Sequence, residues 1–278
     1  MSGSVSTAIS EFRRRAEAQR RPSGFLPLPG LELLTIVLVA GTALAISPVG
    51  RDIDRFFHIR VITRADGWYR FFDDVLDRLS SQRVVGTLLV LVALWCAART
   101  RSLAPVFIAG LAELMFAATG VLKVVLAKSS TTLGDPDWWN GGMLSHGKQS
   151  MAYPSGHATE SVLLWGAILL LLVLHVPRWR RRHTLLAAQV WHLVIVNTIV
   201  VSWLMGRHWI SDLAAGLVCG LIGLRLVVGL VERGYPQAAA DLCAPALAWL
   251  RRVASAPSTP ASVHPVIPNP DTYHSWLR

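Results

Sequence analysis

Arg207, His208 and Asp212 form a short run that suits phosphoryl transfer and lies at the start of a long apolar segment. On a helix, residues four apart share a face, so the Asp212 carboxylate is placed to accept the Nδ1 proton of His208. Nε2 of His208 then keeps its lone pair as a nucleophile, while the carboxylate stabilises the developing imidazolium. A polar pair that closes a contact between two helices is the alternative interpretation.

A second run, Pro-Ser-Gly-His at residues 154–157, directly precedes another apolar segment. Ser155 suits the N-cap of a helix, and Gly156 allows a ligand to approach the backbone. Free amides at a helix start bind phosphate, and His157 beside that anion is placed to protonate a leaving oxygen. The alternative is an ordinary turn into a membrane helix, with an interfacial histidine.

Two lysines supply positive charge between these runs. Lys123 lies near the end of an apolar segment, and Lys128 follows five residues later, before a run of hydroxyl residues at 129–132. Their ammonium groups are candidate ligands for phosphate oxygens. A lysine that ends a membrane span also extends to the interface without binding anything, and that interpretation stays open.

The composition indicates a polytopic membrane protein. Of 278 residues, 53% are hydrophobic and 16% are charged, whereas a soluble domain has about 25% charged residues. The net charge of +10 comes mainly from arginines in tails and short loops. No basic face with interleaved aromatic residues is present, so nucleic acid is not an expected partner. The three cysteines are scattered, which predicts neither a disulfide framework nor a zinc site.

Six apolar segments are long enough to cross a bilayer, which takes roughly 20 helical residues. We therefore predict an all-α fold, a six-transmembrane helical bundle. The segment at 84–98 is the shortest and borrows length from its flanks. The predicted spans are 31–49, 84–98, 104–126, 158–176, 184–205 and 210–231.

Short basic loops predict the orientation of these spans. Arginines at 99 and 101 join the second and third spans, and arginines at 178 and 180–182 join the fourth and fifth. With the arginines of the N-terminal segment and those at 251 and 252, they mark the cytoplasmic side. Both chemical runs lie on the opposite side. We expect a multi-pass protein of the plasma or inner membrane with cytoplasmic termini and an extracytoplasmic site. The predicted divisions are a basic segment at 1–30, a membrane domain at 31–233, and a weakly ordered cytoplasmic tail at 234–278.

Residues 50–83 lie between the first two spans. Arginines and aspartates nearly balance there, and several aromatic residues accompany them. This mixture is typical of an amphipathic helix on the membrane surface. A solvated loop is the other interpretation.

The runs, taken in order, resemble the motifs of the type 2 phosphatidic acid phosphatase superfamily, the lipid phosphate phosphatases, whose core is shared with vanadium haloperoxidases. The family's second motif, Pro-Ser-Gly-His, is present at 154–157, and the histidine and aspartate of its third motif match His208 and Asp212. The resemblance implies His208 as the nucleophile, Asp212 as its orienting group and His157 as the general acid. It also implies Ser155 and the Gly156 amide as phosphate ligands.

Two positions depart from the family motifs. Lys123 matches the first motif's lysine, but Ser130 stands where the motif has arginine, and Ser202 stands at the third motif's arginine position. Bidentate guanidinium–phosphate contacts are strong, so their loss weakens phosphate binding unless other cations replace them. Lys128 and Arg207 are the candidate replacements.

Three functions stay open from the sequence. The first is a metal-independent phosphatase, without a cofactor, that acts on a phosphomonoester or pyrophosphate of a polyprenyl or glycerolipid in the bilayer. The second is a related lipid phosphotransferase, in which an acceptor alcohol replaces water. The third is a catalytically degenerate member that binds phospholipid or serves as a scaffold. The sequence predicts no particular lipid and no oligomeric state.

Overall fold

The computed structural model describes residues 28–139, 142–176 and 179–255. The chain divides into two compact units, one to Leu242 and one from Cys243. The helix bundle and the candidate site belong to the first unit. Within the described ranges the ordered elements are helices and turns without a β-strand, which confirms the predicted all-α class. The predicted segment 1–30 lies largely outside the described residues.

Five helices are long and apolar enough to cross a membrane, and a bent pair of helices makes a sixth candidate span. The pair is α2 (Leu31–Ile46) and α3 (Pro48–Phe56). The five single helices match the second to sixth predicted spans in order, and the bent pair lies at the first. The five single helices are α5 (Gln82–Thr100), α6 (Ala104–Leu126), α8 (Gly156–His175), α9 (Arg181–Leu204) and α10 (Ile210–Glu232).

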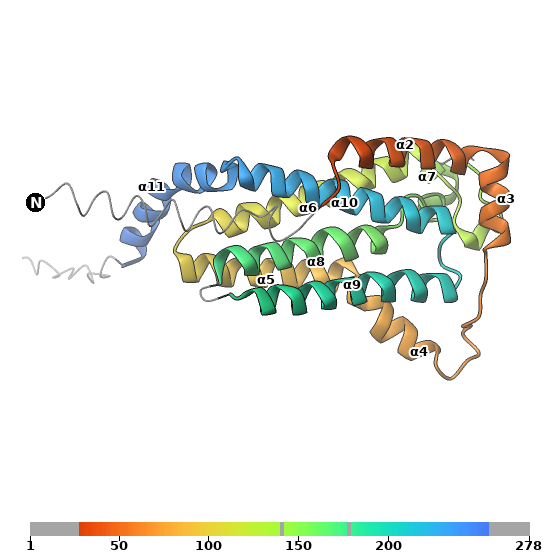
Figure 1. The fold of residues 1–278 in the computed structure, drawn as a ribbon, viewed down its shortest axis with the longest axis horizontal. Coiled ribbons are helices and arrows are strands. Elements are labelled where there is room, and N and C mark those ends of the chain that lie inside the picture. Colours follow the sequence, from red (N-terminus) through yellow and green to blue (C-terminus); the bar gives the residue numbers. More distant parts are fainter. Residues whose placement is uncertain (1–27, 140–141, 177–178, 256–278) are drawn as a thin grey trace, which may run out of the picture. The chain divides into compact units, whose positions relative to one another are not determined.

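The first predicted span, 31–49, is wrong as a single straight helix, because the chain bends by 84° between α2 and α3. Pro48 disfavours helical backbone at the residue before it, and Ser47 is extended with ψ at 159°. The Ser47 hydroxyl then caps α3 by accepting the Gly50 amide at 3.2 Å. This bend carries α3 across the end of the helices that contains the site (Figure 1).

Helix α8 forms the centre of the bundle. Over the apolar 18-residue stretch that could cross a membrane, 78% of the residues of α8 are buried inside the protein. The same share is 44% for α10 and 28% for each of α5, α6 and α9. A helix that is apolar all round fits such a central position. Leu163 and Leu164 of α8 pack with Val85 of α5, Trp191 of α9 and Leu224 of α10 in one continuous core.

Glycines bring α10 into close contact with α8. A Cβ atom on Gly216 would lie 2.6 Å from the Ser155 carbonyl oxygen, and one on Gly220 would lie 2.7 Å from Cβ of Val162. Small residues one turn apart allow two membrane helices to approach this closely. The contact brings the first turn of α10, with Asp212, beside the start of α8.

The connections at this end of the bundle contain further short helices. Residues 57–68 have little helix, and a helical stretch then runs from α4 (Tyr69–Phe71) through single turns at Phe72–Leu76 and Asp77–Ser80. Region 50–83 is thus partly helical and partly loop. Helix α7 (Gly142–His146) lies at the same end (Figure 1). Beyond α10, helix α11 spans Tyr235–Ser255 within the segment expected to be weakly ordered.

Candidate active site

Asp212 lies in the first turn of α10, and His208 lies two residues before that helix, so the pair does not share one helix as the spacing predicted. Nδ1 of His208 lies 3.3 Å from Oδ2 of Asp212, and the same oxygen accepts the Trp209 amide at 3.1 Å. Asp212 is fully buried, whereas the His208 side chain is 17% exposed. The carboxylate is therefore fixed beneath the imidazole, and Nδ1 of the ring is engaged by it.

His208 shares a cleft with His157. The cleft has a volume of about 540 Å³, which is sufficient for a lipid headgroup. Lys123, Gly156 and Glu160 also line it, and Nζ of Lys123 donates to the Met151 carbonyl at 3.1 Å. Two imidazoles, an ammonium group and the backbone at the start of α8 thus surround one space. Residues from the start of α5 and just before it complete the lining: Arg78, Ser81, Gln82, Arg83 and Val84.

Ser155 serves the framework of this cleft and does not line it. Its buried hydroxyl accepts the Ala158 amide at 3.4 Å and so caps α8. Its own amide donates to the Asp212 carbonyl at 2.9 Å. Ser155 therefore fixes the start of α8 against α10, and Gly156 and His157 are the residues of this turn that reach the cleft.

Lys128 is not brought to the cleft, because it is fully buried beneath Asp212. Its Nζ donates to Oδ1 of Asp212 at 2.9 Å, to Oδ2 of Asp54 at 2.6 Å and to Oγ of Ser211 at 2.6 Å. The Trp138 ring centroid lies 5.2 Å from the same nitrogen. With all its donors engaged, Lys128 is placed to hold Asp212 and not to contact a phosphate.

Arg207 also points elsewhere. Its guanidinium pairs with Asp73 and Asp77, in the helical stretch before α5. Burial alone lowers the pKa of Arg207, but Asp77 and Asp73 outweigh it and raise that pKa above the ordinary value. Oδ2 of Asp77 lies 3.6 Å from Nε2 of His157. Arg207 thus fixes a carboxylate that faces the cleft histidine.

Ser130 and Ser202, which stand where the family motifs have arginine, do not lie in the cleft with the histidines. Ser202 is 1% exposed, and its hydroxyl has no hydrogen-bond partner among the described residues. The Ser130 hydroxyl instead bonds the Thr132 hydroxyl at 2.6 Å. Neither serine lines the cleft that holds His157 and His208.

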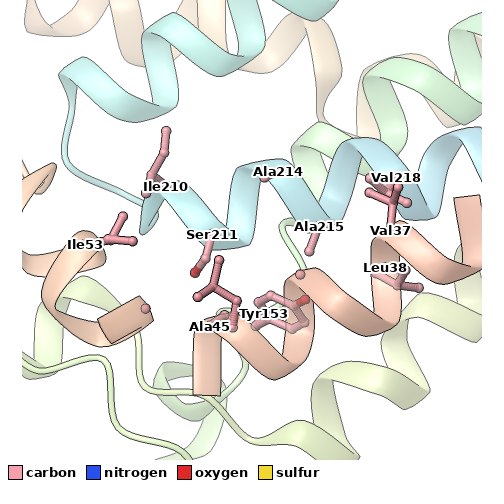
Figure 2. Close-up of a pocket in the computed structure, with 13 residues that line it drawn as sticks. Val37, Leu38, Ala45, Ile53, Tyr153, Ile210, Ser211, Ala214, Ala215 and Val218 are labelled. Carbon is pink, nitrogen blue, oxygen red and sulfur yellow. The ribbon is translucent and has the colours of Figure 1, made fainter. Parts of the chain in front are cut away.

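A second cavity, of about 230 Å³, lies between α2 and α10 and is lined mainly by aliphatic side chains (Figure 2). Tyr153 and Ser211 supply its polar groups. The Tyr153 hydroxyl bonds the Thr42 hydroxyl at 2.6 Å, and burial raises the pKa of Tyr153 to about 12. The cavity lacks the histidines, so it is not the candidate reaction site.

Asp54 and Asp77 belong to the candidate site, although the sequence alone does not indicate them. Both lie in the stretch of mixed charge at 50–83, where neither spacing nor composition distinguishes them from their acidic neighbours. Their burial is the only distinguishing signal, since Asp54 is fully buried and Asp77 is 7% exposed. Among the described residues, no group of three His, Cys, Asp or Glu side chains is arranged to hold a metal ion.

The sequence of residues 108–235 matches the PAP2 superfamily model. These residues form a PAP2 superfamily domain. The PAP2 domain contains Lys123, the run at 154–157 and the His208–Asp212 pair, whereas α2, α3 and α5 precede it.

A solved structure shares this fold. The crystal structure of the transmembrane PAP2 type phosphatidylglycerolphosphate phosphatase from Bacillus subtilis aligns with a TM-score of 0.61 and 17% sequence identity. The alignment covers 73% of this chain and 96% of that one. No sequence match was found among proteins with curated descriptions. The fold is therefore that of a PAP2 membrane phosphatase.

Proposed function

We propose that this protein is a lipid phosphatase that hydrolyses a phosphomonoester or pyrophosphate of a polyprenyl or glycerolipid through a phosphohistidine on His208. One observation carries the proposal: His208, bonded to the buried Asp212, lines the same cleft as His157 and Lys123. This combination supplies a nucleophile, a proton donor and positive charge at one place.

In the first step, Nε2 of His208 attacks the phosphorus atom and the bond from phosphorus to the lipid oxygen breaks. Asp212 accepts the Nδ1 proton in a hydrogen bond and stabilises the positive charge that develops on the ring. His157 donates a proton to the lipid oxygen, which leaves as an alcohol or, from a pyrophosphate, as the lipid monophosphate. Lys123 faces the negative charge on the phosphoryl oxygens.

In the second step, water attacks the phosphohistidine. His157, now neutral, takes a proton from that water as the phosphorus–nitrogen bond breaks and His208 recovers its lone pair. Inorganic phosphate leaves the cleft. None of these steps assigns a role to a metal or a cofactor, because the side chains provide both the proton transfer and the charge.

The buried network beneath the site supports this chemistry. Oδ1 of Asp212 is held by Lys128, so Oδ2 stays directed at His208. Asp54 in turn holds Lys128 and accepts the Ser211 amide at 3.0 Å. Reacting groups need such fixed partners, since a displacement of about 1 Å can cost about 100-fold in rate.

We also propose that the cleft opens on the extracytoplasmic side. The arginines at 99 and 101 and at 180–182 lie in or beside the α5–α6 and α8–α9 connections, at the opposite end of the helices from His157 and His208. Basic loops favour the cytoplasm. Labelling of a cysteine placed at exposed Leu144 by a membrane-impermeant reagent on intact cells tests this orientation.

The function is tested with purified protein and three substrates, namely phosphatidic acid, phosphatidylglycerol phosphate and a polyprenyl pyrophosphate. We expect release of inorganic phosphate from one of them and a loss of about 10⁴-fold or more in kcat for His208→Ala. His192→Ala is the matched control, since this α9 histidine lies outside the cleft.

Phosphohistidine is sought by rapid quenching with a ³²P-labelled substrate. Labelled wild type and unlabelled His208→Ala are expected. If no substrate is turned over and no label is trapped while the lipids still bind, the protein is a binding member and not an enzyme. Transfer of phosphate to an added lipid alcohol in preference to water identifies the phosphotransferase instead.

A further inference from the structure

The proposed chemistry leaves the phosphate short of cations. Lys128 is enclosed by Asp54, Asp212 and Ser211, and Arg207 is paired with Asp73 and Asp77. Neither lines the cleft with the histidines. The resemblance to the family motifs leads us to expect two guanidinium groups there, at positions that contain serine.

Two other arginines do line that cleft. Arg78 lies in the last turn of the helical stretch before α5, and Arg83 lies in the first turn of α5. Both line the space bounded by Lys123, His157 and His208. Arg83 is exposed and has no ion pair or hydrogen bond from its side chain among the described residues. Arg78 pairs with Asp74 at 2.5 Å, but its side chain is 61% exposed. An exposed pair of this kind contributes little and exchanges readily.

We propose that Arg83, assisted by Arg78, binds the phosphate of the lipid substrate in place of the two arginines that the motifs lack. This inference rests on the proposed function of the cleft. Besides the two histidines, the basic side chains of the lining are Arg78, Arg83 and Lys123, and its acidic side chain is Glu160. This excess of positive charge suits a phosphomonoester, which carries about −1.5 to −2 at pH 7, better than a singly charged diester.

The segment that carries the two arginines is fixed to the bundle on both sides of each arginine. The Asn197 amide donates to the Leu76 carbonyl at 2.8 Å, and the Trp165 indole donates to the Leu79 carbonyl at 3.0 Å. Ser80 and Thr198 share a buried hydrogen bond of 2.5 Å. The backbone that presents the arginines is therefore preorganised by α8 and α9.

Two more contacts complete this attachment. Asp77, the residue before Arg78 in the chain, pairs with the Arg207 guanidinium. Gln82, the residue before Arg83, donates a side-chain hydrogen bond to Glu113 of α6 at 2.8 Å. A fixed backbone lowers the entropy that a long side chain loses when it binds an anion. Arg207 and Gln82 thus act as positioning residues for the two cations.

The test uses the full chain in detergent free of phospholipid. With the best lipid phosphate substrate, Arg83→Gln is expected to raise KM by about 10- to 100-fold, and Arg83→Lys by less, because lysine keeps the charge without the bidentate fork. Arg78→Gln is expected to have a smaller effect. Arg70→Gln is the matched control, since Arg70 is an exposed arginine of the same region that does not line the cleft.

A binding measurement separates this inference from the proposed function. Calorimetric titration of His208→Ala with inorganic phosphate needs no turnover, and adding Arg83→Gln to that variant is expected to weaken the affinity by the same factor. If His208→Ala fails to bind phosphate, or binds it equally with and without Arg83, the inference is overturned even when the wild type is active.

A third outcome concerns the source of the phosphate. If Arg83→Gln changes activity only in vesicles that contain anionic phospholipid and never in detergent, Arg83 contacts bilayer headgroups and not the substrate, which also overturns the inference. If the wild type shows no turnover but phosphate binding depends on Arg83, the proposed function fails while this site stands.

Discussion

Replacing Lys128 by methionine tests the buried network beneath the candidate nucleophile. The ammonium group lies between two fully buried carboxylates, at 2.6 Å from Asp54 and 2.9 Å from Asp212. Methionine has a similar length but no charge. The variant therefore leaves two buried acids without their shared cation.

Removing one partner of a buried ion pair costs about 3–5 kcal/mol. One kcal/mol shifts the melting temperature of a domain of this size by about 2–4 °C, so Lys128→Met is expected to melt about 6–20 °C below wild type. Activity is expected to fall by at least about 100-fold, because Asp212 loses the partner that keeps its second oxygen directed at His208.

Two buried cysteines provide the assay. Cys96 and Cys219 are buried and free, whereas Cys243 is partly exposed. In a Cys243→Ser background, a thiol-reactive dye therefore reports unfolding of the helix bundle in detergent. Heating curves give the melting temperature for each variant.

Asp54→Asn supplies the matched control. It leaves one cation facing one carboxylate, so it is expected to cost less stability than Lys128→Met. Combining the two is expected to recover about 1–3 kcal/mol relative to the sum of the single changes. A Lys128→Met protein that melts within about 2 °C of wild type, or additive single effects, would refute the assignment of Lys128 to this network.

Two further predictions concern helix packing and proton transfer. Gly220→Val is expected to cost about 1–3 kcal/mol of stability, because the added side chain overpacks against α8. The control is Gly110→Ala, whose Cβ meets no atom within 4 Å and which is expected to leave the melting temperature unchanged. Equal melting temperatures for the two variants would contradict the close packing of α8 and α10. His157→Ala is expected to lower kcat by about 10²- to 10⁴-fold for a lipid alcohol leaving group and by less for a more acidic leaving group such as p-nitrophenol. An equal loss with both substrates would exclude His157 as the proton donor.

Local patterns in the sequence identify much of the fold. Apolar length predicted the spans because each membrane helix must satisfy its own backbone hydrogen bonds within the bilayer. The closeness of His208 and Asp212 was likewise predictable from their separation of four residues. The expectation that both lie on one helix was wrong, because His208 lies two residues before α10, which begins at Ile210. Pro48 indicates a helix break at Ser47, the residue before it, but the length of the apolar run favoured one continuous span.

The partners of the charged residues were not predictable in this way. Asp54 lies 74 positions before Lys128 in the chain, and it reaches Lys128 only because α3 turns across the end of the helices. Arg207 reaches Asp73 and Asp77 across 134 and 130 positions of the chain. Arg78 and Arg83 precede the matched PAP2 residues, so no motif spacing connects them to the histidines.

The sequence by itself determined which segments are long and apolar enough to cross a membrane and which imidazoles and carboxylate are available, because apolar length and residue spacing act over short distances along the chain. Only the tertiary structure decided which cations face the cleft. An ion pair forms wherever folding brings opposite charges together and excludes water, so Lys128 and Arg207, although near the nucleophile in the sequence, are engaged by aspartates from elsewhere. The cleft instead presents Arg78 and Arg83.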